Sequence, residues 1–347
     1  MPPATNRASL VLPWIGNNEL FQADHPRNRD SVFAPFILLR EHLLTHGIEL
    51  NTSDVNQGRP VAFELHLDVQ ERTTPDAPAY LMLFETPSIY PRNELNEETL
   101  SRYRKILTWD DSLVDGQKVG RFNLPCCQIS VPEADGFAKR PRFCCVIAGN
   151  KITRQTDPRE LYTERVRVIR WFERNAAADF DLYGTNWDSP QRRRGVLGKL
   201  EKNLWRHVLK PLGRKPFPSY RGRVEHKHQV LRSIRFSFCY ENMQGLPGYI
   251  TEKVFDSFLA GCVPVYWGAS NIADLIPANC FVDRRQFKDT GEVYRHLKSL
   301  TEEEYVKHQQ NIGSFLRSSM AHSFSFEAFA KTVSDTILQD LDIAAGR

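Results

Sequence analysis

Apolar positions in the second half of the chain form short continuous runs that alternate with stretches of helical spacing. The runs at 143–148 and 235–240 have the length of buried strands. The stretches at 160–175 and 251–260 place apolar residues on one face of a helix. Strands alternating with helices predict a parallel sheet covered on both faces. Further strands are expected at 181–183, 262–267 and 280–283.

The first half is irregular at its start and then shows the same kind of pattern. Strand-like runs occupy 61–67, 80–84 and 106–109, and apolar spacing predicts a helix over 36–46. The polar segment 131–141 contains Pro and Gly and predicts a linker. We therefore expect an α/β fold with an N-terminal domain over 1–140 and a C-terminal domain over 141–325. Residues 326–347 are expected to form a helix that packs on the body.

Composition narrows the class of protein. The 347 residues are 41% hydrophobic and 11% aromatic, enough for a sizeable core, which excludes a disordered chain. The net charge of +4 is too weak to indicate nucleic acid, although it is compatible with an anionic ligand or membrane surface. No apolar run approaches the ~20 residues of a membrane helix, and the first thirty residues do not read as a signal peptide.

Cysteine usage favours a reducing compartment. Seven cysteines cannot all pair within the chain, and the doublets at 126–127 and 144–145 lack the spacing of a zinc or redox site. Four of the seven lie in apolar strand-like runs, where a reduced thiol acts as a small hydrophobe: Cys144, Cys145, Cys239 and Cys262. We therefore expect a cytoplasmic protein, with peripheral contact to the inner membrane left open.

The densest chemical signal lies between Phe236 and Gly268. Glu241 and Asn242 follow a predicted strand, at the edge where parallel sheets bind their ligands. Thr251 can cap the next helix, which puts Glu252 and Lys253 in its first turn. A helix start attracts phosphate, Lys253 adds positive charge, and Glu252 can accept hydrogen bonds from a sugar diol. Placement suggests a nucleotide-sugar site, but the same spacing also fits a solvated helix start.

This segment resembles the donor-binding motif of the α-1,3/1,4-fucosyltransferases of glycosyltransferase family 10, especially the bacterial members. The resemblance rests on Glu241-Asn242, on Tyr249-Ile250-Thr251-Glu252-Lys253 and on the spacing Gly261-x-Val263-Pro264-Val265-x-x-Gly268. The run 145–150 is similar to the first strand of the family's donor domain, which ends in an Asn, here Asn150. The run 163–167 resembles the helix start that supplies an Arg to the diphosphate, here Arg165. The stretch between Asn150 and Arg165 is longer than is usual in the family.

Phe84-Glu85-Thr86-Pro87 resembles the family's Phe-Glu-Ser-Pro, in which the Glu is the proposed catalytic base. The resemblance implies the GT-B fold, two Rossmann-like domains facing a cleft, with GDP-fucose on the second and the acceptor on the first. It implies an inverting transfer in which Glu85 is the general base, while Arg165 and Lys253 hold the charge of the leaving diphosphate. A metal ion or other cofactor would then not be required.

Asn150, Asn242, Tyr249 and Glu252 complete the donor site that the resemblance implies. Two alternatives stay open at single residues: Tyr249 can instead pack on the core at the helix entry, and Glu85 can be a surface residue after an edge strand. Two alternatives concern the whole protein: a GT-B transferase for another GDP-deoxysugar, or a non-catalytic GDP- or glycan-binding protein.

The expected partners are a GDP-sugar donor and an oligosaccharide or glycoconjugate acceptor, without nucleic acid. An α-1,3 or α-1,4 linkage is expected, while the acceptor and the oligomeric state cannot be read from the residues. The basic run Arg192–Arg194 is ambiguous, because it can be a solvated loop, border the donor phosphates or face an anionic membrane.

Overall fold

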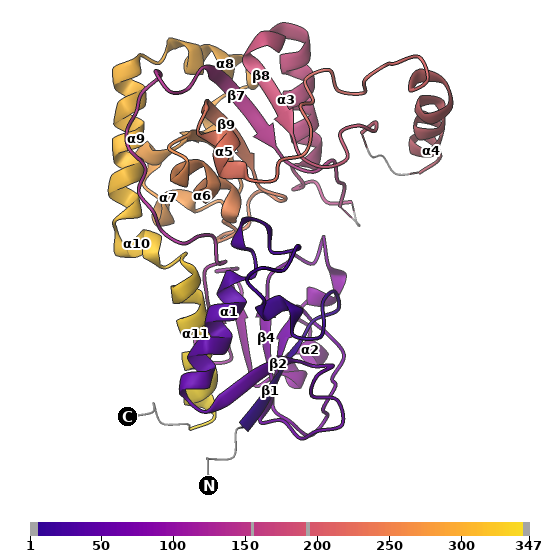
Figure 1. Cartoon of the computed structure of the whole chain (residues 1–347), viewed down its shortest axis with the longest axis vertical. Helices are drawn as coiled ribbons and strands as arrows, with labels where there is room; N and C mark the ends of the chain where they lie inside the picture. Colours follow the sequence, from indigo (N-terminus) through magenta and orange to yellow (C-terminus); the bar gives the residue numbers. More distant parts are fainter. Residues whose placement is uncertain (1–5, 154–155, 192–194, 343–347) are drawn as a thin grey trace. The chain divides into compact units, whose positions relative to one another are not determined.

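The structure, a computed structural model, describes residues 6–153, 156–191 and 195–342, and it divides into two compact units (Figure 1). Unit 1 comprises Met1–Gln128, Pro247–Tyr249 and His322–Arg347, and unit 2 comprises Ile129–Leu246 and Ile250–Ala321. The chain therefore changes unit about twelve residues before the expected boundary. The buried Arg140 explains this, since its guanidinium donates to the carboxylate of Asp135 and to three backbone carbonyls of unit 2.

Unit 1 is built on a six-stranded, fully parallel sheet of order β2-β1-β3-β4-β5-β6. Two helices, α1 (Ala34–Thr45) and the C-terminal α11 (Phe326–Asp340), pack against each other in this unit (Figure 1). Phe329 of α11 contacts the rings of Phe36, Phe84 and Phe122, so the predicted C-terminal helix is part of this core. The strands are β1 (Asn6–Val11), β2 (Ile48–Thr52), β3 (Phe63–Leu67), β4 (Ala79–Leu83), β5 (Lys105–Thr108) and β6 (Val119–Arg121), with the short helix α2 (Glu97–Arg102).

Unit 2 is built on a five-stranded, fully parallel sheet of order β11-β10-β9-β7-β8. Its strands are β7 (Arg142–Ile147), β8 (Phe180–Tyr183), β9 (Ile234–Tyr240), β10 (Val263–Trp267) and β11 (Val282–Asp283). Its helices are α3 (Tyr162–Asn175), α4 (Gly195–Leu204), α5 (Lys227–Leu231), α6 (Glu252–Leu259), α7 (Ile272–Leu275), α8 (Thr290–Ser299), α9 (Glu302–Leu316) and α10 (Ser319–His322), the last reaching the first residue of the next unit 1 segment.

The expected α/β class with two parallel, Rossmann-like sheets is confirmed, and every strand predicted from an apolar run is present to within two residues. The predictions did not include β1, β2 and the three-residue β6. β1 and β2 carry polar residues that the fold nevertheless buries, such as Ser9 and Asn51, so neither stands out as an apolar run. The segment expected to be a linker, 131–141, has no helix or strand before β7, yet it is fixed to unit 2 through Arg140.

All seven cysteines are buried. Burial raises the pKa of the Cys144, Cys262 and Cys280 thiols, the last to about 12. These side chains therefore act as apolar core residues, as their positions in the sequence suggested. Within the described part of the chain, every helix is too short or too polar to cross a membrane.

Candidate functional site

The strand order of the unit 2 sheet reverses between β7 and β9, and the predicted donor residues gather at that point. β7 leads to Asn150, β9 leads to Glu241 and Asn242, and the helices that follow these strands carry Arg165 and Lys253. Open parallel sheets bind ligands outside the carboxyl ends of their strands at such a reversal. The topology therefore places four of the predicted donor residues where this fold has its natural binding crevice.

Glu241 forms the centre of this site. Its side chain is fully buried, and its carboxylate accepts hydrogen bonds from the backbone N–H of Thr251 (2.9 Å) and from the Thr251 hydroxyl (2.7 Å). Thr251 occupies the N-cap position of α6 as expected, but its hydroxyl makes no capping bond to the helix. Instead the carboxylate at the end of β9 holds the first turn of α6 in place.

Lys253 is the counterion of Glu241. Its ammonium lies 3.0 Å from Glu241 Oε2 and 2.8 Å from the Thr251 hydroxyl oxygen, and its side chain is 20% exposed. Burial alone would lower the pKa of Lys253, but the carboxylates of Glu241 and Glu252 outweigh that effect and raise it. Lys253 is therefore a fixed cation at the start of α6.

Glu252 lies on the more open side of this helix start, with 46% of its side chain exposed. Its carboxylate is 3.9 Å from the Lys253 ammonium and 3.8 Å from that of Lys227, which also pairs with Asp256 at 2.7 Å. Burial would raise the pKa of Glu252, but these two cations lower it well below its usual range. An ionised, accessible carboxylate beside a lysine can accept paired hydrogen bonds from a sugar diol.

Arg165 and Asn242 contact each other, as the prediction of a common site requires. Arg165 is buried on α3, and its Nη2 donates to Asn242 Oδ1 at 3.0 Å and to the Tyr240 carbonyl at 2.6 Å. Its Nε donates to the same carbonyl at 3.1 Å, and its guanidinium lies over the Tyr162 ring. The strand end of β9 is thereby tied to α3, and positive charge is brought to the carboxyl edge of the sheet.

Asn150 holds the neighbouring loop. The side chain is buried, and its amide nitrogen donates to the carbonyls of Asn186 (3.1 Å), Ser189 (3.3 Å) and Pro190 (3.0 Å). Gly184, at the start of this loop, has a φ of +124°, and an added Cβ would overlap the Ala148 carbonyl. Asn150 thus shapes the loop after β8, and its direct contact with a donor stays a prediction.

The remaining two predicted residues, Glu85 and Tyr249, belong to unit 1. Tyr249 is 2% exposed and its ring centroid lies 4.6 Å from that of Trp109, which fits the packing alternative at this position. Glu85 follows β4 and is part-buried. Its backbone N–H donates to Asp68 Oδ1 (3.1 Å) and its carbonyl accepts from the side chain of the buried Asn93 (2.8 Å), so two hydrogen bonds fix the backbone of Glu85. Its catalytic role stays a prediction.

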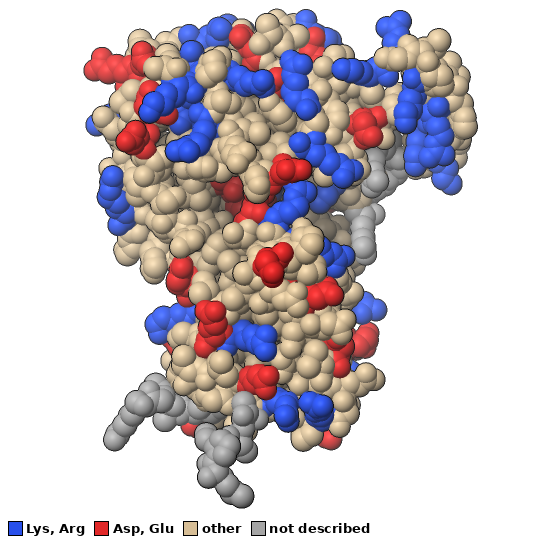
Figure 2. Space-filling model, in the orientation of Figure 1, with Lys and Arg blue, Asp and Glu red and all other residues tan. Residues whose placement is uncertain are grey.

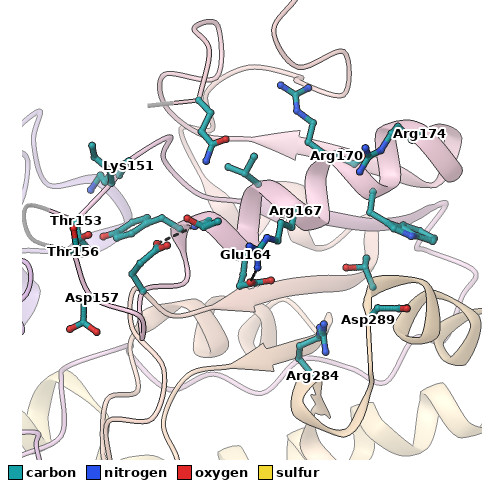
Figure 3. Close-up of a pocket in the computed structure, with 18 of the residues that line it drawn as sticks. Lys151, Thr153, Thr156, Asp157, Glu164, Arg167, Arg170, Arg174, Arg284 and Asp289 are labelled. Atoms are coloured by element: carbon teal, nitrogen blue, oxygen red, sulfur yellow. Dashed lines mark hydrogen bonds and ion pairs between the residues drawn. The ribbon is translucent and has the colours of Figure 1, made fainter. Parts of the chain in front are cut away.

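Unit 2 also has a hollow of about 880 Å³ beside α3, shown in Figure 3. None of the predicted donor residues lines it. Sequence reasoning missed this hollow because its walls come from four separate segments. These are the loop after β7, α3 itself, Gln191 in the loop after β8, and the stretch from Arg284 to the start of α8. Its charged lining residues include Lys151, Asp157, Glu160, Glu164, Arg167, Arg170, Arg174, Arg284, Lys288 and Asp289.

No three His, Cys, Asp or Glu side chains among residues 6–153, 156–191 and 195–342 are grouped so that they could hold a metal ion. The expectation that no metal is required stays a prediction. The basic run Arg192–Arg194 lies outside the described residues.

Comparison with protein families matches residues 179–316 to the model "Glycosyltransferase family 10 (fucosyltransferase) C-term". The chain is 35% identical over 77 residues to alpha-(1,3)-fucosyltransferase FucT of Helicobacter pylori and 33% identical over 76 residues to an Arabidopsis thaliana alpha-(1,4)-fucosyltransferase. Each match covers 22% of this chain, and 16% and 19% of the relatives. The chain therefore spans less than a fifth of the length of these two proteins.

Solved structures extend the likeness to the whole fold. A crystal structure of alpha1,3-fucosyltransferase with GDP matches at a TM-score of 0.52 with 15% identity, covering 98% of this chain and 92% of that chain. An alpha-glucosyltransferase bound to UDP and DNA matches at 0.56 with 10% identity, covering 97% and 100%. At these identities the likeness concerns the fold alone, and it confirms the predicted GT-B class.

Proposed function

We propose that the protein transfers L-fucose from GDP-fucose to a hydroxyl group of a glycan, since residues 179–316 match the fucosyltransferase C-terminal model of glycosyltransferase family 10. Relatives named as alpha-(1,3)- and alpha-(1,4)-fucosyltransferases support an α-1,3 or α-1,4 linkage. An oligosaccharide or glycoconjugate is the proposed acceptor.

One observation carries the proposal. The matched segment contains the carboxyl end of β9 and the start of α6, where Asn242, Glu252 and Lys253 lie together at the reversal of the strand order. A fixed ammonium and the free N–H groups of a helix start suit a diphosphate. The ionised Glu252 suits the hydroxyls of a ribose or of the transferred sugar.

The proposed reaction is a displacement with inversion at the anomeric carbon. The acceptor hydroxyl oxygen forms a bond to C1 of fucose while the bond between C1 and the GDP oxygen breaks. Glu85 takes the hydroxyl proton as general base. Arg165 and Lys253 stabilise the charge that develops on the diphosphate, the role that a metal ion has in other transferases, so no metal or other cofactor is proposed.

The test is to incubate purified protein with a panel of GDP-sugars and a set of glycan acceptors. Turnover is measured as GDP released and as the mass of the glycan product. We expect GDP-fucose to be the best donor and the product to gain one deoxyhexose. Transfer of only another GDP-sugar would replace fucose in the proposal. GDP binding without any turnover would favour a non-catalytic binding protein.

A further inference from the structure

The segment from α4 to Leu212 carries an exposed apolar face. Seven of the fourteen large apolar side chains that the structure describes as exposed lie within residues 196–212, a span of 17 residues. Their exposed fractions run from 37% for Leu209 to 77% for Leu197. The seven are Val196, Leu197, Leu200, Leu204, Val208, Leu209 and Leu212. Such a concentration on one surface element is typical of an interaction site rather than of scattered surface residues.

The spacing of these residues makes the helix amphipathic. Val196, Leu200, Leu204 and Val208 recur every four residues along α4 and the π-helical turn Trp205–Leu209 that continues it. Basic residues occupy the other side at 199, 202, 206 and 210. A helix with residues at these two sets of positions has one apolar stripe and one cationic stripe.

The positive charge of the segment indicates that its binding partner is a negatively charged surface. Residues 195–215 contain six Lys or Arg and a single acid, Glu201. Figure 2 shows basic side chains gathered over this helix, which lies apart from the other helices of unit 2 in Figure 1. The basic residues are Lys199, Lys202, Arg206, Lys210, Arg214 and Lys215. An apolar stripe flanked by cations is the pattern of helices that lie in the interface of an anionic membrane.

We propose that the amphipathic segment 195–215 docks the protein on an anionic lipid membrane, with Val196, Leu200, Leu204 and Val208 inserted below the headgroups and the lysines and arginines at the phosphates. A second copy of the chain fits less well, since it would bring a like-charged segment against this one. A protein interface would have a core depleted of such charges. Trp205, beside the apolar stripe, is the residue type that prefers the membrane interface.

Vesicle co-sedimentation tests the proposal. The full-length protein should sediment with vesicles of phosphatidylcholine and phosphatidylglycerol, remain in solution with phosphatidylcholine alone, and be released in part by high salt. The double variant Leu200→Glu/Leu204→Glu should lower partitioning at least about tenfold, because two acids replace inserted leucines. The matched control is Leu44→Glu, since Leu44 of α1 is 55% exposed against 59% and 53% for the two leucines.

Tryptophan emission gives a second readout. The emission of the wild type should shift to shorter wavelength on adding anionic vesicles, and this shift should be absent in Trp205→Phe. Failure of the wild type to bind anionic vesicles, or equal binding by the double variant and the control, would overturn the proposal. A wild-type dimer in sedimentation velocity that becomes monomeric in Leu200→Glu/Leu204→Glu would instead assign the face to a second copy. Neither readout involves turnover, so the result is independent of the proposed activity.

Discussion

The ammonium of Lys253 lies 3.0 Å from the carboxylate of Glu241, although the two residues belong to different elements of unit 2. Glu241 ends β9 and is fully buried, while Lys253 is in the first turn of α6. This pair ties the first turn of α6 to the end of β9 and holds the lysine ammonium beside Glu241 and Thr251. Lys253 therefore offers an anionic ligand a cation whose position is fixed before binding, which lowers the entropy cost of binding.

The pair makes Glu241 a stability residue. Glu241→Gln keeps the shape of the side chain but removes the counterion of Lys253 and weakens the anchor of Thr251. We expect the free energy of unfolding to fall by about 1–3 kcal/mol, the usual cost of leaving a buried polar group without its partner. Urea unfolding measures this change. Glu252→Gln is the control. An equal loss of stability in both variants would show that the ion pair between Glu241 and Lys253 does not stabilise the fold more than an exposed charge does.

Lys253→Met tests the charge of the donor site. Removing a charged hydrogen-bond donor to phosphate costs about 1.5–3 kcal/mol, so we expect GDP to bind about 10- to 100-fold more weakly. Isothermal titration with GDP measures the affinity. Lys227→Met is the matched control, because Lys227 pairs with Asp256 and Glu252 and is not proposed to touch phosphate. Unchanged GDP affinity in Lys253→Met would remove the lysine from the proposed site.

Glu85→Gln tests the proposed base. A general base contributes about 10²- to 10⁴-fold to a rate, so we expect kcat for fucosyl transfer to fall by that factor. GDP affinity should remain within about threefold, since a base for the acceptor hydroxyl does not hold the leaving group. The control is Glu94→Gln, an exposed residue a few positions along the chain. Near wild-type transfer by Glu85→Gln would assign the base role to another residue.

More of the donor site than of the other features could be predicted from the sequence, because the residues of the donor site are close together in the chain. Asn242, Glu252 and Lys253 come from one βα unit, so the spacing of the motif already fixes their approximate positions. The role of Glu241 as counterion and helix anchor was missed, because it depends on side-chain direction across the turn. The signal was present as an acid at a strand end followed by Thr-x-Lys at the next helix start.

Other features could not be predicted because burial rather than local pattern decides them. β1 belongs to the interior and β2 to the edge of the unit 1 sheet, and both carry buried polar residues, Ser9 and Asn51. The buried Asn56 donates to Ser9 Oγ and to the Ala8 carbonyl. The hollow beside α3 depends on four segments that only the fold brings together. The amphipathic segment 195–215 was not predicted. Only the preceding basic run Arg192–Arg194 was considered for an anionic membrane.

Chelation tests the absence of a metal requirement. If Arg165 and Lys253 supply the charge that stabilises the leaving diphosphate, fucosyl transfer should proceed at an unchanged rate in excess EDTA. The measurement is the initial rate with and without chelator, followed by addition of Mg²⁺ or Mn²⁺ to the treated enzyme. Complete loss with EDTA and recovery with either metal would assign part of that charge to a bound cation.

Glu64 gives unit 1 a stability that depends on pH. Its side chain is fully buried on β3, and its carboxylate accepts hydrogen bonds from the side chains of Arg72 (2.8 Å) and Thr73 (2.5 Å) and from backbone N–H groups, including that of Thr74. Burial would raise the pKa of Glu64, but these bonds and His66 outweigh it and lower the pKa to about 2.

The unfolded chain has the ordinary glutamate pKa of about 4.3, so it takes up the proton before the folded state does as the pH falls. The stabilisation by Glu64 is therefore fully present above that pH and is lost as the pH falls from there toward 2.

Urea unfolding of the wild type and Glu64→Gln between pH 7 and about 3.5 measures this stabilisation. We expect a constant difference above pH 5 that shrinks below about 4.3. The exposed Glu98→Gln should follow the wild type throughout. A difference that stays constant down to pH 3.5 would mean that the Glu64 carboxylate titrates in the folded state as it does in the unfolded chain.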